Sequence, residues 1–90
     1  MSIEVRIPTI LRQYTSGEKA VEGSGATLAE LIDDLESRHA GLRARLVDEK
    51  GLRRFVNVYL NDEDVRVLDG LDTAVSDGDT VVILPAMAGG

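Results

Sequence analysis

The chain has 90 residues, no cysteine and a formal net charge of −6, with a sequence pI of about 4.6. Its length fits one domain, and a hydrophobic content of 43% predicts a folded domain with one core. The absence of cysteine excludes disulfide bonds and thiolate metal sites, and an acidic chain without a basic run argues against binding to nucleic acids or anionic membranes. The net charge either favours a protein partner with a basic surface or serves only to keep a small protein soluble.

The N-terminal residues lack the basic region and the long apolar stretch of a signal peptide. No apolar run approaches the roughly 18 residues that a transmembrane helix requires. We therefore expect a cytoplasmic protein without a membrane-spanning segment.

Residues 3–7 alternate between apolar and charged side chains, which predicts a half-buried strand that Pro8 ends. Turn-forming residues at 15–18 lead to a second strand at 19–22. The two strands should pair as a hairpin.

A helix is predicted to start at Thr27, because Thr27 and Glu30 have the spacing of a capping box. Its apolar residues fall at the i, i+3, i+4 and i+7 positions of one stripe, namely Leu28, Leu31, Ile32 and Leu35. Arg38 suits the last turn, and Gly41 suits a left-handed stop.

The second half of the chain is predicted to hold three strands. After an irregular stretch at 42–53, with a short turn that holds Leu42 and Leu46, comes a strand at 55–60. In that strand Val56, Val58 and Leu60 should share one face, and Phe55, Asn57 and Tyr59 the other. The next residues predict a turn at 61–64 and a short edge strand at 65–67. A loop at 68–79 follows, with Leu71 and Val75 tucked inward. The last predicted element is an apolar central strand at 80–84.

This order predicts an α+β protein of the β-grasp, or ubiquitin-like, type. Its mixed sheet should have four to five strands, with the first and last strands central and parallel and one main helix on one face. We expect a β-grasp domain over residues 1–84 and a flexible C-terminal tail over residues 85–90, which ends in Gly-Gly.

No catalytic constellation emerges from the sequence. The single histidine, His39, lies off the apolar stripe of the helix, and no nucleophile has an evident base beside it. The consecutive acids Asp62, Glu63 and Asp64 lack the wider spacing and further ligands of a calcium loop. We expect neither an enzyme nor a metal site.

The tail is the unusual feature. Pro85 should stop the sheet, so that the carboxylate of Gly90 is held beyond the globule. Glycine lets a backbone pass through a narrow channel into another protein's active site. Adenylation by ATP would activate this carboxylate, and a sulfur donor could then convert the adenylate into a thiocarboxylate.

Residues 77–90, DGDTVVILPAMAGG, resemble the end of the ThiS/MoaD family of ubiquitin-like sulfur carriers, and the resemblance covers nearly the whole chain. Residues 7–12 and 54–66 are especially similar to the CysO type within that family, the type that supplies a cysteine synthase. The resemblance implies that Gly90 is the residue adenylated and thiocarboxylated. It also implies that a partner's active site receives the remaining tail residues, which are Pro85, Ala86, Met87, Ala88 and Gly89.

The implied partners are a ThiF/MoeB-like activating enzyme, which uses ATP, and a sulfur-acceptor enzyme such as a cysteine synthase or a thiosugar synthase. A zinc metalloprotease that releases new cysteine from the tail is a further implied partner. The carrier itself would bind no cofactor.

The resemblance also implies docking on the helix-free face of the sheet. By the predicted alternation, Phe55 and Tyr59 lie there as aromatic anchors, unless loops cover them. The acids Asp62, Glu63 and Asp64 would add charge complementarity.

Two other functions are compatible with the same sequence. A ubiquitin-like modifier would form isopeptide bonds to lysine through Gly90, because an amine can attack the same acyl-adenylate. A plain interaction module would not use its tail at all.

Overall fold

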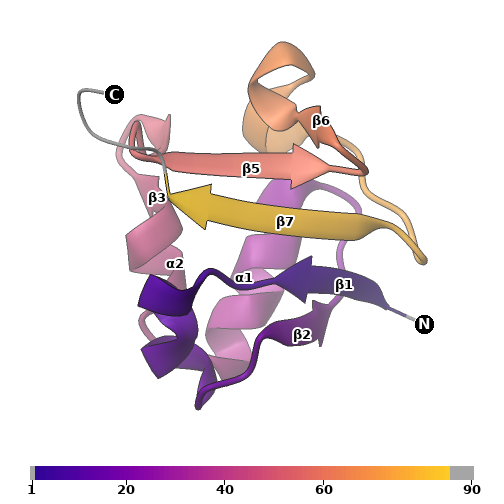
Figure 1. Ribbon diagram of the computed structural model, residues 1–90. Coiled ribbons are helices and arrows are strands. Elements are labelled where there is room, and N and C mark those ends of the chain that lie inside the picture. The colour runs from indigo at the N-terminus through magenta and orange to yellow at the C-terminus, as the bar shows by residue number, and fades with distance from the viewer. Residues whose placement is uncertain (1, 86–90) are drawn as a thin grey trace.

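The computed structural model describes residues 2–85 and confirms the β-grasp architecture. Its main sheet has the strand order β2-β1-β7-β5-β6. These strands are β1 (Ile3–Arg6), β2 (Ala20–Gly23), β5 (Val56–Leu60), β6 (Glu63–Asp64) and β7 (Thr80–Pro85). As predicted, the first and last strands are central and parallel, with Val5 opposite Val81, and the other pairs are antiparallel (Figure 1).

The main helix, α1 (Leu28–Arg38), forms as the capping box predicts. The Thr27 hydroxyl accepts a hydrogen bond from the Glu30 amide at 3.3 Å, and the Glu30 carboxylate accepts one from the Ala26 amide at 3.1 Å. These two bonds satisfy amides that have no partner within the helix. All four residues of the predicted apolar stripe are buried.

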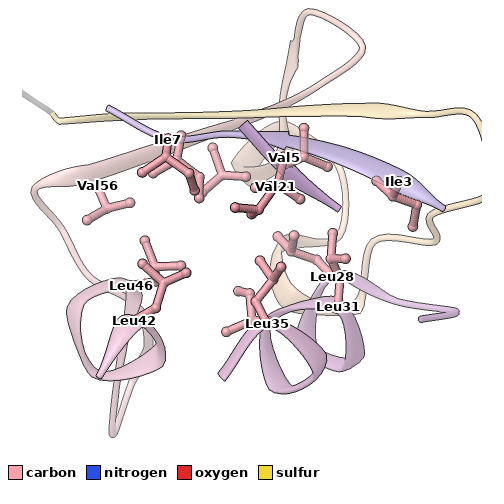
Figure 2. Close-up of a cluster of buried hydrophobic side chains, with 14 of the residues drawn as sticks. Ile3, Val5, Ile7, Val21, Leu28, Leu31, Leu35, Leu42, Leu46 and Val56 are labelled. Carbon is pink, nitrogen blue, oxygen red and sulfur yellow. The ribbon is translucent and has the colours of Figure 1, made fainter. Parts of the chain in front are cut away.

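The core lies between α1 and one face of the sheet. Figure 2 shows Ile3, Val5 and Val21 of the sheet facing Leu28, Leu31 and Leu35 of α1. Gly23 in β2 permits this close approach, since a Cβ at that position would lie 2.8 Å from Leu31 Cδ1. In β1 and β2, the alternate residues Glu4, Arg6, Ala20 and Glu22 are exposed, which leaves the opposite face of the sheet without a covering helix.

The 3₁₀ helix η1 (Thr9–Thr15), which follows β1, was not predicted. A 3₁₀ helix eclipses residues three apart, and Leu11 and Tyr14, which pack on the core, have that spacing. The buried hydroxyl of Thr15 lies 2.9 Å from the Glu18 carbonyl, to which it donates, and 3.2 Å from the Arg12 carbonyl, and it anchors the end of the segment. Seven residues are too few for the sequence pattern to distinguish such a helix from a loop.

The stretch predicted as irregular also has structure. It forms a short helix, α2 (Leu42–Leu46), and a two-stranded ladder of β3 (Val47–Asp48) and β4 (Gly51–Leu52). The predicted short turn that holds Leu42 and Leu46 is the helix α2, and both side chains are completely buried.

Glu36 of α1 joins the two helices. Its carboxylate accepts hydrogen bonds from the amides of Gly41 and Arg43 at 2.9–3.2 Å. These backbone bonds, first that from Arg43, lower the pKa of Glu36 from its usual value of 4.5.

The edge strand was predicted in the wrong place. Residues 65–67 form a 3₁₀ helix, η2 (Val65–Val67), and the edge strand is β6, inside the predicted turn. The turn needs only two residues, Asn61 and Asp62, because both have positive φ (48° and 75°). Pairing therefore resumes at Glu63, opposite Leu60. A third 3₁₀ helix, η3 (Gly70–Asp72), follows, with Leu71 and Val75 packed on the core as predicted.

The bounds of strands β5 and β7 each differ from the predicted bounds by one residue. Strand β5 begins at Val56 instead of residue 55, and β7 continues through Pro85 instead of ending at residue 84. Pro85 lies opposite Val56 at the end of the ladder. Proline has no amide to donate, so it fits only where pairing stops.

Candidate functional site

The candidate site is the end of the sheet at which β7 finishes. The predicted reactive residue, Gly90, and the tail residues Ala86, Met87, Ala88 and Gly89 lie outside the described residues. The structure does describe the surface from which they continue, because Pro85 lies at the end of β7 beside the start of β5 (Figure 1).

Two grooves flank Pro85. The first, of about 540 Å³, lies between η1, α2 and the segment before β5. Its lining includes Ile10, Arg45, Arg53, Arg54, Phe55 and Leu84, which we call the exit surface. The second groove lies on the helix-free face, beside β1 and β7, and its lining includes Arg6, Arg12 and Lys19.

The exit surface has an apolar centre. Ile10, Phe55 and Leu84 are 63%, 54% and 44% exposed. Among residues 2–85, the other large hydrophobic side chains with such exposure are Val67 and Leu68, in and beside η2. Apolar side chains gathered on one exposed surface are typical of a site for protein contact.

Positive charge gathers around this apolar centre, although the protein is acidic. The linings of the two grooves include six of the ten lysines and arginines of the chain and two of its sixteen acidic residues. The basic residues are Arg6, Arg12, Lys19, Arg45, Arg53 and Arg54, and the acidic residues are Glu4 and Asp48. The sign of the charge at the end of β7 is therefore opposite to that of the whole protein.

Neutral groups hold the three arginines of the exit surface. Arg45 Nε donates to the Tyr14 hydroxyl at 2.6 Å, and the guanidinium lies 5.3 Å from the centre of the Tyr14 ring. Arg53 Nε donates to the Ala44 carbonyl at 2.8 Å, and the Arg54 guanidinium lies 6.0 Å from the centre of the Phe55 ring.

Ion pairs do not offset these charges. Within the described part of the chain, the ion pairs join Arg6 to Glu4, Arg38 to Asp34 and Arg43 to Asp33. None of them involves an arginine of the exit surface, so no carboxylate within residues 2–85 neutralises Arg45, Arg53 or Arg54 by direct pairing.

A fourth arginine positions the segment before β5. From η2, Arg66 donates to the Arg53 carbonyl at 2.7 Å, the Val56 carbonyl at 2.6 Å and Asn57 Oδ1 at 2.9 Å. The Val56 amide also donates to the Arg53 carbonyl at 3.1 Å, which closes a turn. Arg54 and Phe55 are the two central residues of this turn, so Arg66 holds the backbone that presents them.

The structure separates the predicted docking residues. Phe55 precedes β5 and lines the first groove as part of the exit surface. Tyr59 is half-buried within β5, opposite Val82 and Asp64. The acids Asp62, Glu63 and Asp64 lie at the other end of the ladder, because Leu60 pairs with Val81 while Val56 pairs with Pro85.

Sequence reasoning missed five members of the exit surface: Ile10, Arg45, Arg53, Arg54 and Leu84. A local signal did exist for two of them, since consecutive arginines precede an aromatic residue in a chain with a pI of about 4.6. Ile10 belonged to no predicted element, and Leu84 was predicted only as the last residue of an apolar strand. Arg45 is distant in sequence and reaches the surface only through the position of α2.

Within residues 2–85, no group of three or more histidine, cysteine, aspartate or glutamate side chains is arranged to hold a metal ion. The helices of this part of the chain are too short or too polar to cross a membrane.

Known proteins share both this fold and this sequence pattern. The chain is 55% identical to the sulfur carrier protein CysO of Mycobacterium tuberculosis (strain ATCC 25618 / H37Rv) and 34% identical to small archaeal modifier protein 3 of Haloferax volcanii, in both cases over the full length of each protein. A chain of the crystal structure of the Amycolatopsis orientalis BexX/CysO complex superposes with a TM-score of 0.92 at 65% identity, with 98% of this chain and 99% of that chain covered. The model of the ThiS family matches residues 5–90. These matches confirm the resemblance predicted from the C-terminal motif, and the chain belongs to the ThiS family.

Proposed function

We propose that the protein is a sulfur carrier that works through the carboxylate of Gly90. The observation that carries this proposal is that the ThiS-family match extends to residue 90, so it includes Gly89 and Gly90 as well as the folded domain. The full-length similarity to CysO, a sulfur carrier by name, supports the same role.

The proposed chemistry takes place at the main-chain carboxylate. An oxygen of the Gly90 carboxylate attacks the α-phosphorus of ATP, and pyrophosphate leaves. Attack by hydrosulfide at the carbonyl carbon of this adenylate forms a C–S bond, and AMP leaves as the bond from carbon to the phosphate oxygen breaks. Loss of the sulfur-bound proton gives a thiocarboxylate, whose sulfur is a nucleophile for the next enzyme.

In this proposal the partners supply catalysis, and the carrier supplies a folded docking domain and the reactive C-terminal carboxylate. A ThiF/MoeB-like enzyme would bind ATP and activate Gly90. A cysteine synthase or a thiosugar synthase would accept the sulfur, and in the first case a zinc metalloprotease would release cysteine from the tail. The occurrence of a similar chain in a complex with a second protein, BexX, supports a role exercised through protein contact.

Intact-mass measurement tests the proposal. The protein is incubated with ATP, sulfide and a ThiF/MoeB-like enzyme from the same organism. We expect a gain of about 16 mass units, the difference between sulfur and oxygen, in the full chain and no gain after deletion of Gly90. An unchanged mass for the full chain with each such enzyme of the organism would contradict the proposal.

The second candidate function is that of a ubiquitin-like modifier, which the 34% identity to small archaeal modifier protein 3 favours. In this case a lysine amine attacks the Gly90 adenylate, an amide forms and AMP leaves. Mass spectrometry of proteolysed cell extract distinguishes the two functions, because only the modifier leaves peptides in which Gly90 is joined to a lysine of another protein.

A further inference from the structure

We propose that the exit surface docks on an acidic protein face with an apolar centre, at the mouth of the site that receives the tail. The net charge of −6 predicts the opposite, a basic partner face. The identity of the partner as an activating or sulfur-accepting enzyme rests on the proposed function. The sign of its surface charge rests on the residues of the exit surface.

The exit surface lies beside the residue from which the tail continues. Pro85 lies at its rim, and Gly90 follows Pro85 by five residue steps. Five extended residues span at most about 17 Å, at roughly 3.4 Å per residue. An enzyme that acts on Gly90 must therefore lie close to Pro85, where the exit surface and the second groove meet.

The centre of the exit surface is apolar and exposed. Phe55 and Ile10, both more than half exposed, and Leu84 offer an aromatic and two aliphatic contacts. Aromatic side chains surrounded by arginines are the residue types that contribute most to protein interfaces. The centre thus fits an apolar patch on the partner.

The arginines of the exit surface have hydrogen-bond donors that no described residue uses. Within residues 2–85, Arg45 and Arg53 use only Nε for hydrogen bonds, and Arg54 makes none. The terminal nitrogens of these side chains therefore form no hydrogen bond to a described residue. Two such nitrogens match the two oxygens of a carboxylate, so aspartate and glutamate are the complementary partner groups.

The acidic turn lies farther from the exit surface than electrostatic attraction reaches in salt solution. The acids at 62–64 follow the far end of β5, and the four residue steps from Val56 to Leu60 alone span about 13 Å at roughly 3.3 Å per residue. The Debye length is about 8 Å at physiological salt. Screening therefore weakens the effect of these three acids at the exit surface, where the first groove is lined by three arginines and one acid, Asp48.

Two double variants test the proposal with equal loss of charge. The exit variant is Arg45→Gln with Arg54→Gln. The control is Arg38→Gln with Arg43→Gln, whose arginines do not line either groove. Thermal unfolding of both variants verifies that they fold.

The first readout needs no enzyme. Backbone amide NMR of the full chain is recorded during titration with the capped peptides Glu-Asp-Leu-Glu-Asp and Lys-Arg-Leu-Arg-Lys. We expect the acidic peptide to shift the amide signals of residues 53–55 in the wild type and in the control, and not in the exit variant. Absence of these shifts in the wild type, or stronger shifts there with the basic peptide, would overturn the proposal.

The second readout is the KM for thiocarboxylate formation with the activating enzyme. We expect KM to rise about tenfold in the exit variant at low salt and less at high salt, and to change less than about twofold in the control. Equal KM values in the two variants would overturn the proposal, as would a lower KM in the exit variant, which would indicate that the arginines bind the protein's own tail. If the wild type gains no sulfur, the proposed function fails, while the peptide titration still decides the present inference.

Discussion

Pro85 lies directly opposite Val56 at the end of the β5–β7 ladder. This pairing places the last described residue beside the turn that carries Arg54 and Phe55. The segment that continues toward Gly90 and the side chains suited to hold a partner therefore share one end of the sheet. The tail and the side chains of the exit surface can be substituted separately, so their contributions to function can be measured separately.

We predict that Phe55→Ala weakens docking without destabilising the fold. Phe55 is 54% exposed and precedes the strand, so its removal leaves no internal cavity. Because aromatic residues at interface centres contribute about 2 kcal/mol or more, the KM for thiocarboxylate formation should rise about 30-fold. Val67→Ala is the matched control, since Val67 is 76% exposed in η2 and does not line either groove. A similar KM for the two variants would exclude Phe55 as an anchor.

We predict that Arg66→Gln loosens the turn before β5. The change removes the hydrogen bonds from the guanidinium to the Arg53 and Val56 carbonyls. The free energy of unfolding should fall by about 1–2 kcal/mol, since each bond contributes roughly 0.5–1.5 kcal/mol. Hydrogen exchange at the Val56 amide, which donates within this turn, should accelerate more than exchange in α1.

Arg66→Lys separates geometry from charge. A lysine keeps the positive charge but has a single nitrogen, so it cannot replace both Nη2, which donates to the Arg53 and Val56 carbonyls, and Nη1, which donates to Asn57 Oδ1. We therefore expect it to restore little of the lost protection at Val56. Full restoration would show that the charge alone holds the turn.

We predict that Glu36 makes stability depend on pH in the acid range. Its folded-state pKa lies below the usual 4.5, because the Arg43 and Gly41 amides donate to the carboxylate. The stability that Glu36 contributes is therefore fully present above pH 4.5 and is lost as the pH falls through the lower folded-state pKa. Glu36→Gln should melt below the wild type at pH 7, and the difference should shrink as the solution is acidified. Melting curves with a constant difference across this range would refute the assignment.

We predict that Gly23→Ala disturbs the contact between β2 and α1. An added Cβ would lie 2.8 Å from Leu31 Cδ1 and 3.0 Å from Leu35 Cδ2, which is closer than packed atoms allow. Such overpacking costs about 1–3 kcal/mol of unfolding free energy, measurable by urea titration. Ala20→Val on the exposed face of the same strand is the control, and it should leave stability nearly unchanged. Equal stability of the Gly23→Ala variant and the wild type would show that α1 can shift away from β2.

The sequence by itself determined the features that depend on local patterns. The capping box at Thr27 and Glu30 and the apolar stripe behind it act within one helix, so the start and the buried face of α1 were correct. The predicted left-handed stop at Gly41 was wrong, because α1 ends at Arg38 with His39 (φ −132°) as its C-cap and Gly41 is the left-handed N-cap of α2. The alternation in residues 3–7 predicted a half-buried strand, the apolar run at 80–84 predicted a central strand, and the order of the elements predicted that the first and last strands are the central pair. The C-terminal motif led to the correct family.

Only the tertiary structure decided where the charges lie. Ile10 comes from η1, Arg45 from α2, Phe55 from the turn before β5 and Leu84 from β7, and no local pattern links these four segments. The antiparallel register of β5 and β7 brings Phe55 to Pro85 and leaves Asp62 at the other end. Net charge is a sum over the whole chain, whereas screening limits each charge to its neighbourhood, so an acidic sequence can fold into a protein with a basic surface where its tail begins.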